Sequence, residues 1–169
     1  MSQWVRETFE QVFNKKWQEM DMYTIYGIAH NICKLEEHVI DGKKRKVYVH
    51  RKGATRSFPD TPVLIAGSMG TASYILKGTE EAMKKSFGST CHGAGRAMSR
   101  NAAIRQFRGD NIKKELADKG IISQSTTPKV LAEEAPLAYK DIEGVIESVH
   151  KAGISLKVAR MIPMGVIKG

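Results

Sequence analysis

Hydrophobic and polar residues follow several distinct periods along this 169-residue chain. Residues 3–19 place aromatic and aliphatic side chains near helical spacing with charged residues between them, which predicts an amphipathic helix whose aromatics face the core. Residues 23–29 are rich in β-formers and predict a strand. Residues 32–51 predict a β-hairpin that turns at Asp41 and Gly42, because this dipeptide adopts the positive φ angles of a tight turn.

The second half of the chain has the pattern of short strands and helices. Apolar runs at 63–66 and 73–76 predict buried strands, and residues 154–167 alternate and predict a final strand. Residues 127–136 predict either an irregular segment or a short helix. Helical spacing predicts further helices at 79–85, 99–107, 111–119 and 141–151. Thr79 is the expected N-cap of the helix at 79–85. This mixture predicts an α+β fold of mixed or antiparallel strands with packed helices.

Length and composition narrow the possible classes of protein. The chain fits one domain over residues 1–169, and its 41% hydrophobic and 27% charged residues are ordinary for a globular protein. The net charge of +9 favours a polyanionic partner, most simply nucleic acid, although many basic proteins bind nothing specific. Cys33 and Cys91 lack the spacing of a disulfide framework or a zinc site. With no apolar run of about 20 residues and no signal-peptide pattern, the sequence predicts a cytoplasmic protein without a membrane partner.

The stretch with the clearest chemical content is the loop 87–96, which sets His92 among glycines and small hydroxyl residues. Glycines let backbone N–H groups approach an anion, and Arg96 and Arg100 downstream supply bidentate phosphate donors. A histidine held there can attack a phosphorus atom. The alternative is a surface turn in which His92 is merely a polar side chain.

Other stretches carry weaker signals. The loop 67–71 offers hydroxyl groups and backbone amides to a ligand, but it matches neither the phosphate-loop nor the dinucleotide motif. Residues 50–56 end a predicted strand with several cations and a glycine. This pattern suits a phosphate-binding site, but it is also found at strand ends that are simply charged. The basic run 43–46 at the hairpin tip is a solvated loop or, less often, an RNA contact. Glu133 and Glu134 suit acid–base chemistry, although a solvated face is the more common role of such a pair.

Six motifs occur together in a fixed order and span nearly the whole chain. They are Ala29-His30-Asn31, Glu36-Glu37-His38, His50-Arg-Lys-Gly-Ala-Thr55, Gly67-Ser-Met-Gly-Thr-Ala-Ser-Tyr74, Gly88-Ser-Thr-Cys-His-Gly-Ala-Gly-Arg96 and Met164-Gly-Val-Ile-Lys-Gly169. Individually some are weak, but in combination they are highly specific. With them the chain resembles the C-terminal part of RtcB-type RNA ligases, which join RNA 3′-phosphate and 5′-hydroxyl ends in tRNA splicing and RNA repair.

That resemblance implies a chemistry and a set of site residues. His92 would attack the α-phosphate of GTP, and the guanylyl group would pass to an RNA 3′-phosphate before the 5′-hydroxyl displaces GMP; a 2′,3′-cyclic phosphate would first be hydrolysed. Manganese is the implied metal, with His30 as a ligand. The backbone of Gly93, Ala94 and Gly95 would lie against the nucleotide. The implied nucleotide and phosphate contacts, with Lys168 at the guanine, are Asn31, Lys52, Ser68, Ser73, Arg100 and Lys168.

Members of that family are longer than this chain, and their N-terminal part supplies the Asp, the Cys and two further His ligands of the metal site. We therefore expect this chain to hold the nucleotide side of the site and to need that part, or an activating protein, for RNA ligation. Residues 56–63 are also fewer than the family has there, which bears on the contact implied for Lys52. Two other hypotheses remain: a catalytically silent fragment that binds RNA or a partner through its basic surface, and a metal-independent GTP-binding module.

Overall fold

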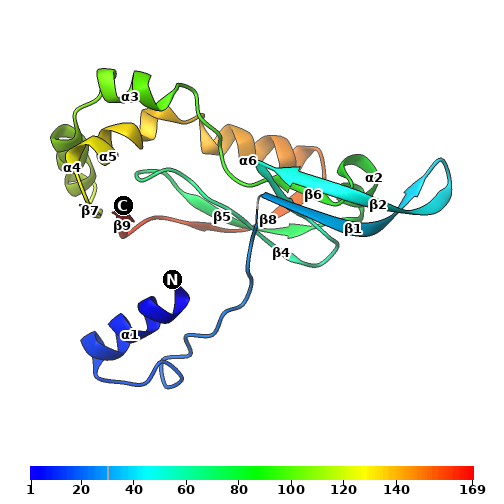
Figure 1. Cartoon of the computed structure of the whole chain (residues 1–169), viewed down its shortest axis with the longest axis horizontal. Coiled ribbons are helices and arrows are strands. Elements are labelled where there is room, and N and C mark those ends of the chain that lie inside the picture. The colour runs from blue at the N-terminus through cyan, green and yellow to red at the C-terminus, as the bar shows by residue number, and fades with distance from the viewer. Residues whose placement is uncertain (30) are drawn as a thin grey trace.

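The computed structural model describes residues 1–29 and 31–169 and confirms an α+β fold. Figure 1 shows a β-hairpin at one end of the molecule, a group of helices at the other, and small sheets between them. In chain order the elements are α1 (Ser2–Phe13), β1 (Asn31–Ile40), β2 (Lys43–Lys52), β3 (Ala54–Arg56), β4 (Pro62–Ile65), β5 (Ser73–Gly78), α2 (Glu80–Ser86), β6 (Ser89–Cys91), α3 (Arg100–Gln106), α4 (Gly109–Asp118), β7 (Ile122–Ser125), α5 (Pro128–Glu133), the 3-10 helix η1 (Pro136–Ala138), α6 (Ile142–Lys151), β8 (Ser155–Met161) and β9 (Gly165–Lys168).

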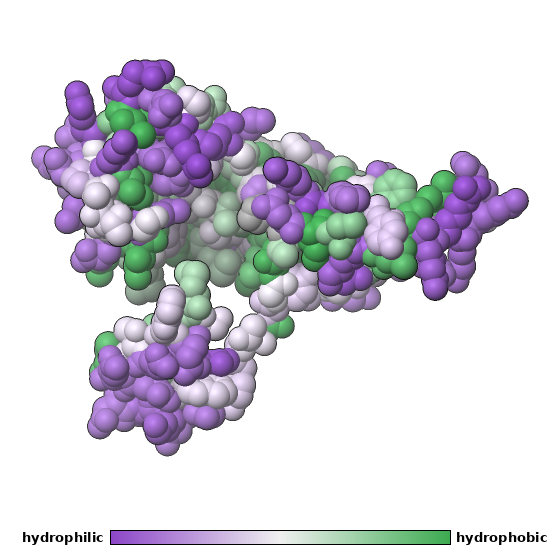
Figure 2. Space-filling model, viewed as in Figure 1, coloured by the Kyte–Doolittle hydropathy of each residue, from purple (hydrophilic) through white to green (hydrophobic). Residues whose placement is uncertain are grey.

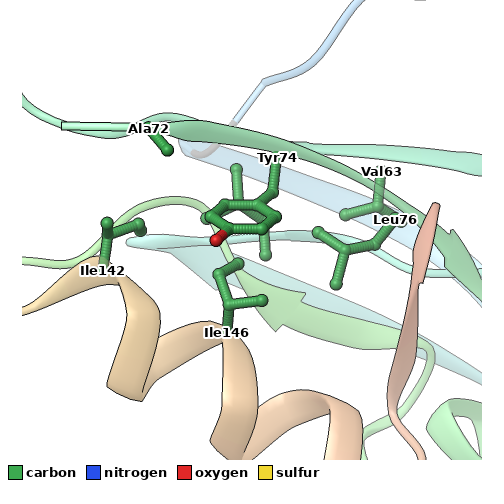
Figure 3. Close-up of a cluster of buried hydrophobic side chains, with 7 residues drawn as sticks. Val63, Ala72, Tyr74, Leu76, Ile142 and Ile146 are labelled. Carbon is green, nitrogen blue, oxygen red and sulfur yellow. The ribbon is translucent and has the colours of Figure 1, made fainter. Parts of the chain in front are cut away.

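The first of two hydrophobic cores lies between a sheet and a helix. The sheet is antiparallel with the order β4-β5-β8, and alternation along β4 and β5 turns their apolar side chains to one face. Helix α6 covers that face with two isoleucines, as Figure 3 shows. The buried members of this core are Val63, Ile65, Ala72, Tyr74, Leu76, Ile142 and Ile146.

The second core lies at the helical end of the molecule. Helices α4 and α5 pack together here, and β9 pairs in parallel with β7 beside them. The parallel pairing fixes the end of the chain, because residues 165–168 hydrogen-bond to a strand about 40 residues earlier in the sequence. The buried members of this core are Met69, Ile112, Leu116, Ile121, Leu131 and Ala135.

The predicted hairpin is confirmed, with β1 and β2 paired in register over ten residues each. Asp41 and Gly42 form its turn with φ angles of 51° and 73°. Figure 1 shows the hairpin projecting beyond the sheets. Its inner face buries the polar residues Glu36, His38 and Arg51, and its other face is exposed.

Side-chain caps explain where several helices begin. Thr79 caps α2 as predicted, with its hydroxyl accepting a hydrogen bond from the Ala82 N–H at 3.2 Å. Ser99, Thr127 and Asp141 cap α3, α5 and α6 in the same way. Residues 127–136 therefore contain a short helix, one of the two forms that the sequence allowed.

The predictions for the N-terminal region were wrong in two respects. Helix α1 ends at Phe13, where Asn14 turns into the left-handed region with φ 49°, and none of its residues is buried. Its aromatic face is exposed rather than core, with Trp4 70% exposed, and Figure 1 shows α1 apart from the sheets. Residues 23–29 form no strand despite their β-formers. Among the residues that the structure describes, no helix is long and apolar enough to cross a membrane.

The prediction of one final strand over 154–167 was also wrong. The chain forms β8, leaves the sheet at 162–164, and continues as β9 in a different sheet. Pro163 lies in this break, and proline cannot donate the hydrogen bond that a continuous strand needs. This break sends the last residues toward the second core instead of along the first.

Candidate functional site

Two loops lie side by side at the ends of β4 and β6. The Ala66 N–H donates to the His92 carbonyl at 3.3 Å, and Ala66 forms a parallel bridge with Gly93. The first loop is held by its own hydroxyl groups, since the Gly67 N–H donates to Ser73 Oγ at 3.1 Å and the Ser68 N–H to Thr71 Oγ1 at 2.8 Å. The contact favours a glycine at 93, because a Cβ there would lie 3.1 Å from the Ala66 carbonyl oxygen, tighter than most such contacts.

A third segment, residues 134–140, closes another side of the site. The Lys140 N–H donates to the Gly95 carbonyl at 3.0 Å, and Arg96 forms an antiparallel bridge with Tyr139. Strand β9 brings Lys168 to the same place, with its Nζ 3.8 Å from Glu134 Oε2. Four segments distant in the sequence therefore meet at one point.

These segments enclose a cavity of about 370 Å³, within the range of about 300–1,000 Å³ that is usual for small-molecule sites. It lies at the junction of the two cores, because Ala94 packs against the first and Met69 belongs to the second. Its lining residues are Ala66, Gly67, Ser68, Met69, His92, Gly93, Ala94, Gly95, Arg96, Glu134, Tyr139 and Lys168.

Arg96 holds the wall of this cavity together. Its guanidinium donates to Glu134 Oε1 at 3.2 Å and to the Tyr139 hydroxyl at 3.0 Å, and also to the Met98 and Glu133 carbonyls. The Tyr139 hydroxyl donates to Glu134 Oε2 at 2.5 Å. Burial, together with the hydrogen bond and charge of Glu134, raises the pKa of Tyr139, so its hydroxyl stays protonated at neutral pH.

This cluster corrects two sequence-based interpretations. Arg96 was a candidate phosphate donor, but its guanidinium is used by protein acceptors on several sides. Glu134 was expected on a solvated face, but its side chain is only 18% exposed and lines the cavity. Tyr139, Met69 and Ala66 were not among the predicted site residues: no local pattern around Tyr139 indicates a site, and the 67–71 loop pattern pointed to its hydroxyls and amides rather than to Met69 or the preceding Ala66.

His92 follows β6 directly and lines the cavity with a partly buried ring. Gly53, at the end of the hairpin, lies against this ring: a Cβ on Gly53 would be 3.8 Å from His92 Cε1, and its φ of 68° also disfavours a side chain. Cys91, just before His92, has its thiol pKa raised by burial, which fits a structural cysteine rather than a reactive one.

Arg51 anchors the segment that leads into the His92 loop. Its guanidinium donates to the Phe87 carbonyl at 2.8 Å, to the Gly88 carbonyl at 3.3 Å and, through Nε, to Ser89 Oγ at 2.8 Å. The same guanidinium forms a bidentate pair with Glu36 at 2.9 and 2.8 Å. Arg51 is 1% exposed, so this ion pair lies in a nearly dry environment. Through Arg51 it joins the hairpin to the segment that leads to His92.

Glu36 makes the stability of this junction depend on pH. Burial opposes its ionisation, but hydrogen bonds from Arg51 and His38 and the charges of Arg51 and Arg56 outweigh burial and hold the Glu36 pKa below its ordinary 4.5. A depressed pKa stabilises the fold above the ordinary value, and that stabilisation is lost as the pH falls through the folded-state pKa. We expect the free energy of unfolding, measured by urea titration, to decline as the pH is lowered from about 5.

The matched variant for this test is Glu36→Gln, which cannot ionise at that position. It is expected to lose part of the decline seen in the native chain below pH 4.5, even though its stability at neutral pH is lower. An unchanged slope of stability against pH in Glu36→Gln would contradict the assignment to this carboxylate.

The structure brings some predicted site residues to the cavity and not others. His92, Gly93, Ala94, Gly95, Ser68 and Lys168 line it. Ser73 supports the Gly67 loop from behind, through its Oγ. Asn31 and Lys52 are cross-strand partners at the base of the hairpin. Lys52 directly precedes Gly53, which lies against the His92 ring. Arg100 begins α3 with an exposed side chain and pairs with Glu133 at 2.9 Å.

The implied metal ligand His30 lies outside the described residues. Among residues 1–29 and 31–169, no three His, Cys, Asp or Glu side chains come together in a way that could hold a metal ion. The described residues therefore do not by themselves fit a manganese site.

Comparison with known proteins identifies the family. The family model described as tRNA-splicing ligase RtcB matches residues 1–169. The tRNA-splicing ligase RtcB of Thermococcus kodakarensis is 55% identical over 182 aligned residues, which cover all of this chain and 38% of that relative. The corresponding ligases of Archaeoglobus fulgidus and Pyrococcus abyssi are 53% and 54% identical, and the chain spans 38% and 20% of them. The chain thus spans well under half the length of these relatives, and it belongs to the tRNA-splicing ligase RtcB family.

Proposed function

We propose that this chain carries the nucleotide-binding side of a GTP-dependent RNA ligase, with His92 as the nucleophile. The observation that carries the proposal is the position of His92 in the wall of a cavity of about 370 Å³, among glycine-rich loops. An imidazole nitrogen of His92 forms a bond to the α-phosphorus of GTP, and the bond to pyrophosphate breaks with pyrophosphate as the leaving group. Neutral imidazole suits this step because it is nucleophilic near neutral pH.

The lining residues support a nucleotide in this cavity. The backbone around Gly93 and Gly95 has no side chains in the way, which lets a phosphate approach N–H groups closely. Lys168 brings a cation and Glu134 an acceptor to the other side, a combination that matches the carbonyl and N–H edge of a purine such as guanine. Tyr139 adds an aromatic ring to the same wall, held by Arg96 at 4.9 Å from its centroid.

The RNA steps follow from the same residue. Transfer of the guanylyl group from His92 to an RNA 3′-phosphate breaks the phosphorus–nitrogen bond and forms an anhydride, which the 5′-hydroxyl of the second RNA attacks with loss of GMP. The name of the relatives, tRNA-splicing ligase, supports RNA as the acceptor. The described residues assemble no metal site, so we assign no step to manganese in this chain; the metal stays an expectation from the family.

The test is covalent labelling with α-labelled GTP and manganese, on the chain alone and after addition of the remaining part of a relative. We expect label on the native chain in at least one of these conditions and its complete loss in His92→Ala, because the nucleophile is gone. The matched control is His150→Ala, a histidine in the last turn of α6 and outside the cavity, which is expected to label normally.

The possible outcomes separate the hypotheses. Equal label on His92→Ala and the native chain would contradict the assignment of the nucleophile. No label in either condition, together with saturable GTP binding, would indicate a GTP-binding module. No label and no GTP binding would leave a basic protein that binds RNA or a partner.

A further inference from the structure

The outer face of the β1–β2 hairpin is an exposed strip, and the site chemistry above involves only its base, at Asn31 and Lys52. Burial alternates along both strands, so one set of side chains packs inward with Arg51 while the other is exposed. Figure 2 shows this hairpin extending from the body, with hydrophilic residues at its tip. We call this strip the hairpin outer face; its cross-strand pairs are Asn31 with Lys52, Cys33 with His50, Leu35 with Tyr48, Glu37 with Lys46 and Val39 with Lys44.

The hairpin outer face combines an aromatic ring with an excess of cations. Tyr48 is 70% exposed and lies opposite Leu35, which leaves its ring open to a stacking partner. Residues 31–52 contain seven Lys and Arg against three Asp and Glu. The buried pair of Arg51 and Glu36 removes one of each from the surface. On the hairpin outer face itself, Lys44, Lys46 and Lys52 accompany one acid, Glu37, which pairs with Lys44 at 3.3 Å, so the strip carries a net positive charge.

The strip also leads to His92. Its base is Lys52, and the next residue, Gly53, lies against the His92 ring, where a Cβ would be 3.8 Å from Cε1. Ten residues of β-strand extend about 30 Å, so the strip connects a distant basic tip to the candidate nucleophile. A polyanion that followed the cations would be delivered to the cavity.

We propose that the hairpin outer face binds a single-stranded RNA segment and guides its end toward His92. Lys44 and Lys46 neutralise phosphates near the tip and Lys52 one at the base, and Tyr48 stacks on an unpaired base between them. A single strand fits better than a duplex, because only unpaired bases offer a face to an aromatic side chain. The inference rests on the proposed function for the identity of the RNA end at His92, but RNA binding itself needs neither GTP nor a metal.

RNA is favoured over a protein partner by charge. An apolar protein contact would use Leu35, Val39 and Tyr48, yet Val39 lies opposite Lys44, and Lys46 lies two positions from Tyr48 on the same face of β2. Protein interfaces are depleted in lysine, whereas single-strand binding surfaces combine lysines with aromatic rings. A second copy of this chain is also disfavoured, because two such basic strips repel one another.

The experiment measures binding of a fluorescent single-stranded RNA of about 12 nucleotides to the whole chain by fluorescence anisotropy, without GTP or manganese. Tyr48→Ala is expected to raise the dissociation constant about tenfold, and Tyr48→Phe to leave it near the native value, because the phenylalanine ring still stacks. Lys44→Ala/Lys46→Ala is expected to reduce the slope of log affinity against log salt by about 1.4, for two lost phosphate contacts. The matched control is Lys113→Ala/Lys114→Ala, an exposed pair on α4.

Several results would overturn the proposal: no RNA binding by the native chain, native affinity in Tyr48→Ala, or equal loss of salt dependence in the two lysine pairs. Dimerisation in sedimentation that Tyr48→Ala abolishes would instead assign the strip to a protein contact. Labelling of His92 is followed in parallel to separate the two proposals. Tyr48-dependent RNA binding without His92 label would overturn the proposed function alone, and label with Tyr48-independent RNA binding would overturn this inference alone.

Discussion

Arg51→Met is expected to lower the free energy of unfolding by about 3–5 kcal/mol, measured by urea unfolding at neutral pH. The change keeps most of the side-chain volume but removes the guanidinium that forms a bidentate pair with Glu36, whose side chain is 4% exposed. The Glu36 carboxylate would then keep only its contacts with His38 at 3.3 Å and Arg56 at 3.4 Å in a nearly dry site, and the Phe87 and Gly88 carbonyls would lose their donor. Covalent labelling of His92 is expected to fall as well, because these residues lead into its loop.

Two further variants make the result specific. Arg105→Met removes an exposed arginine from α3 and is expected to change stability by no more than about 0.5 kcal/mol. Glu36→Leu/Arg51→Met replaces both partners by apolar groups and is expected to be more stable than Arg51→Met alone, since no unpaired charge remains at Glu36. If Arg51→Met proved no more damaging than Arg105→Met, the buried pair would not be what joins the hairpin to the His92 loop.

Gly67→Ala is the second substitution with a large expected effect. A Cβ at this position would lie 2.0 Å from the Ala72 carbonyl oxygen and 2.8 Å from Thr71 Oγ1, so the backbone of the loop must move. Forced overpacking of this kind costs about 1–3 kcal/mol. The moving loop carries Ser68 in the cavity wall, so nucleotide affinity, measured by titration calorimetry with GTP, is expected to fall more than tenfold, equivalent to about 1.4 kcal/mol.

Gly27→Ala is the matched control for that substitution. A Cβ at Gly27 has no described atom within 4 Å, and the position does not require a positive φ, so the change is expected to be nearly neutral for stability. Normal GTP affinity in Gly67→Ala, or an equal loss in both variants, would show that the 67–71 loop tolerates a side chain and does not form the wall described above.

Features governed by neighbouring residues could be predicted from the sequence. The hairpin followed from Asp41 and Gly42 with flanking alternation, and the start of α2 from Thr79, because turns and caps depend on a few adjacent residues. The candidate loop around His92 was likewise found from its local glycines and hydroxyl groups. Each of these signals is complete within about ten residues of sequence.

Features that depend on distant partners could not be predicted. Nothing near Glu134 or Tyr139 indicates that Arg96 draws both into a cavity wall, since the contacts span about 40 residues. The last predicted strand is split because β9 pairs with β7 instead of continuing β8. The alternation of apolar and polar residues does not indicate which strand is the partner. The aromatics of α1 have core-like spacing, but spacing only shows that a face is apolar, not that something covers it.

The pairing of β5 with β8 has a consequence for how the protein reaches its working state. Gly78 pairs with Ser155, and the chain between them contains the His92 loop, Arg96 and Glu134. Local hairpins such as β1–β2 form within microseconds, whereas contacts between distant residues form late because closing long loops costs entropy first. We therefore expect the cavity to be assembled late in folding, after most secondary structure is present. If the proposed function holds, recovery of nucleotide binding, rather than recovery of helix and strand content, is expected to report when this protein has folded.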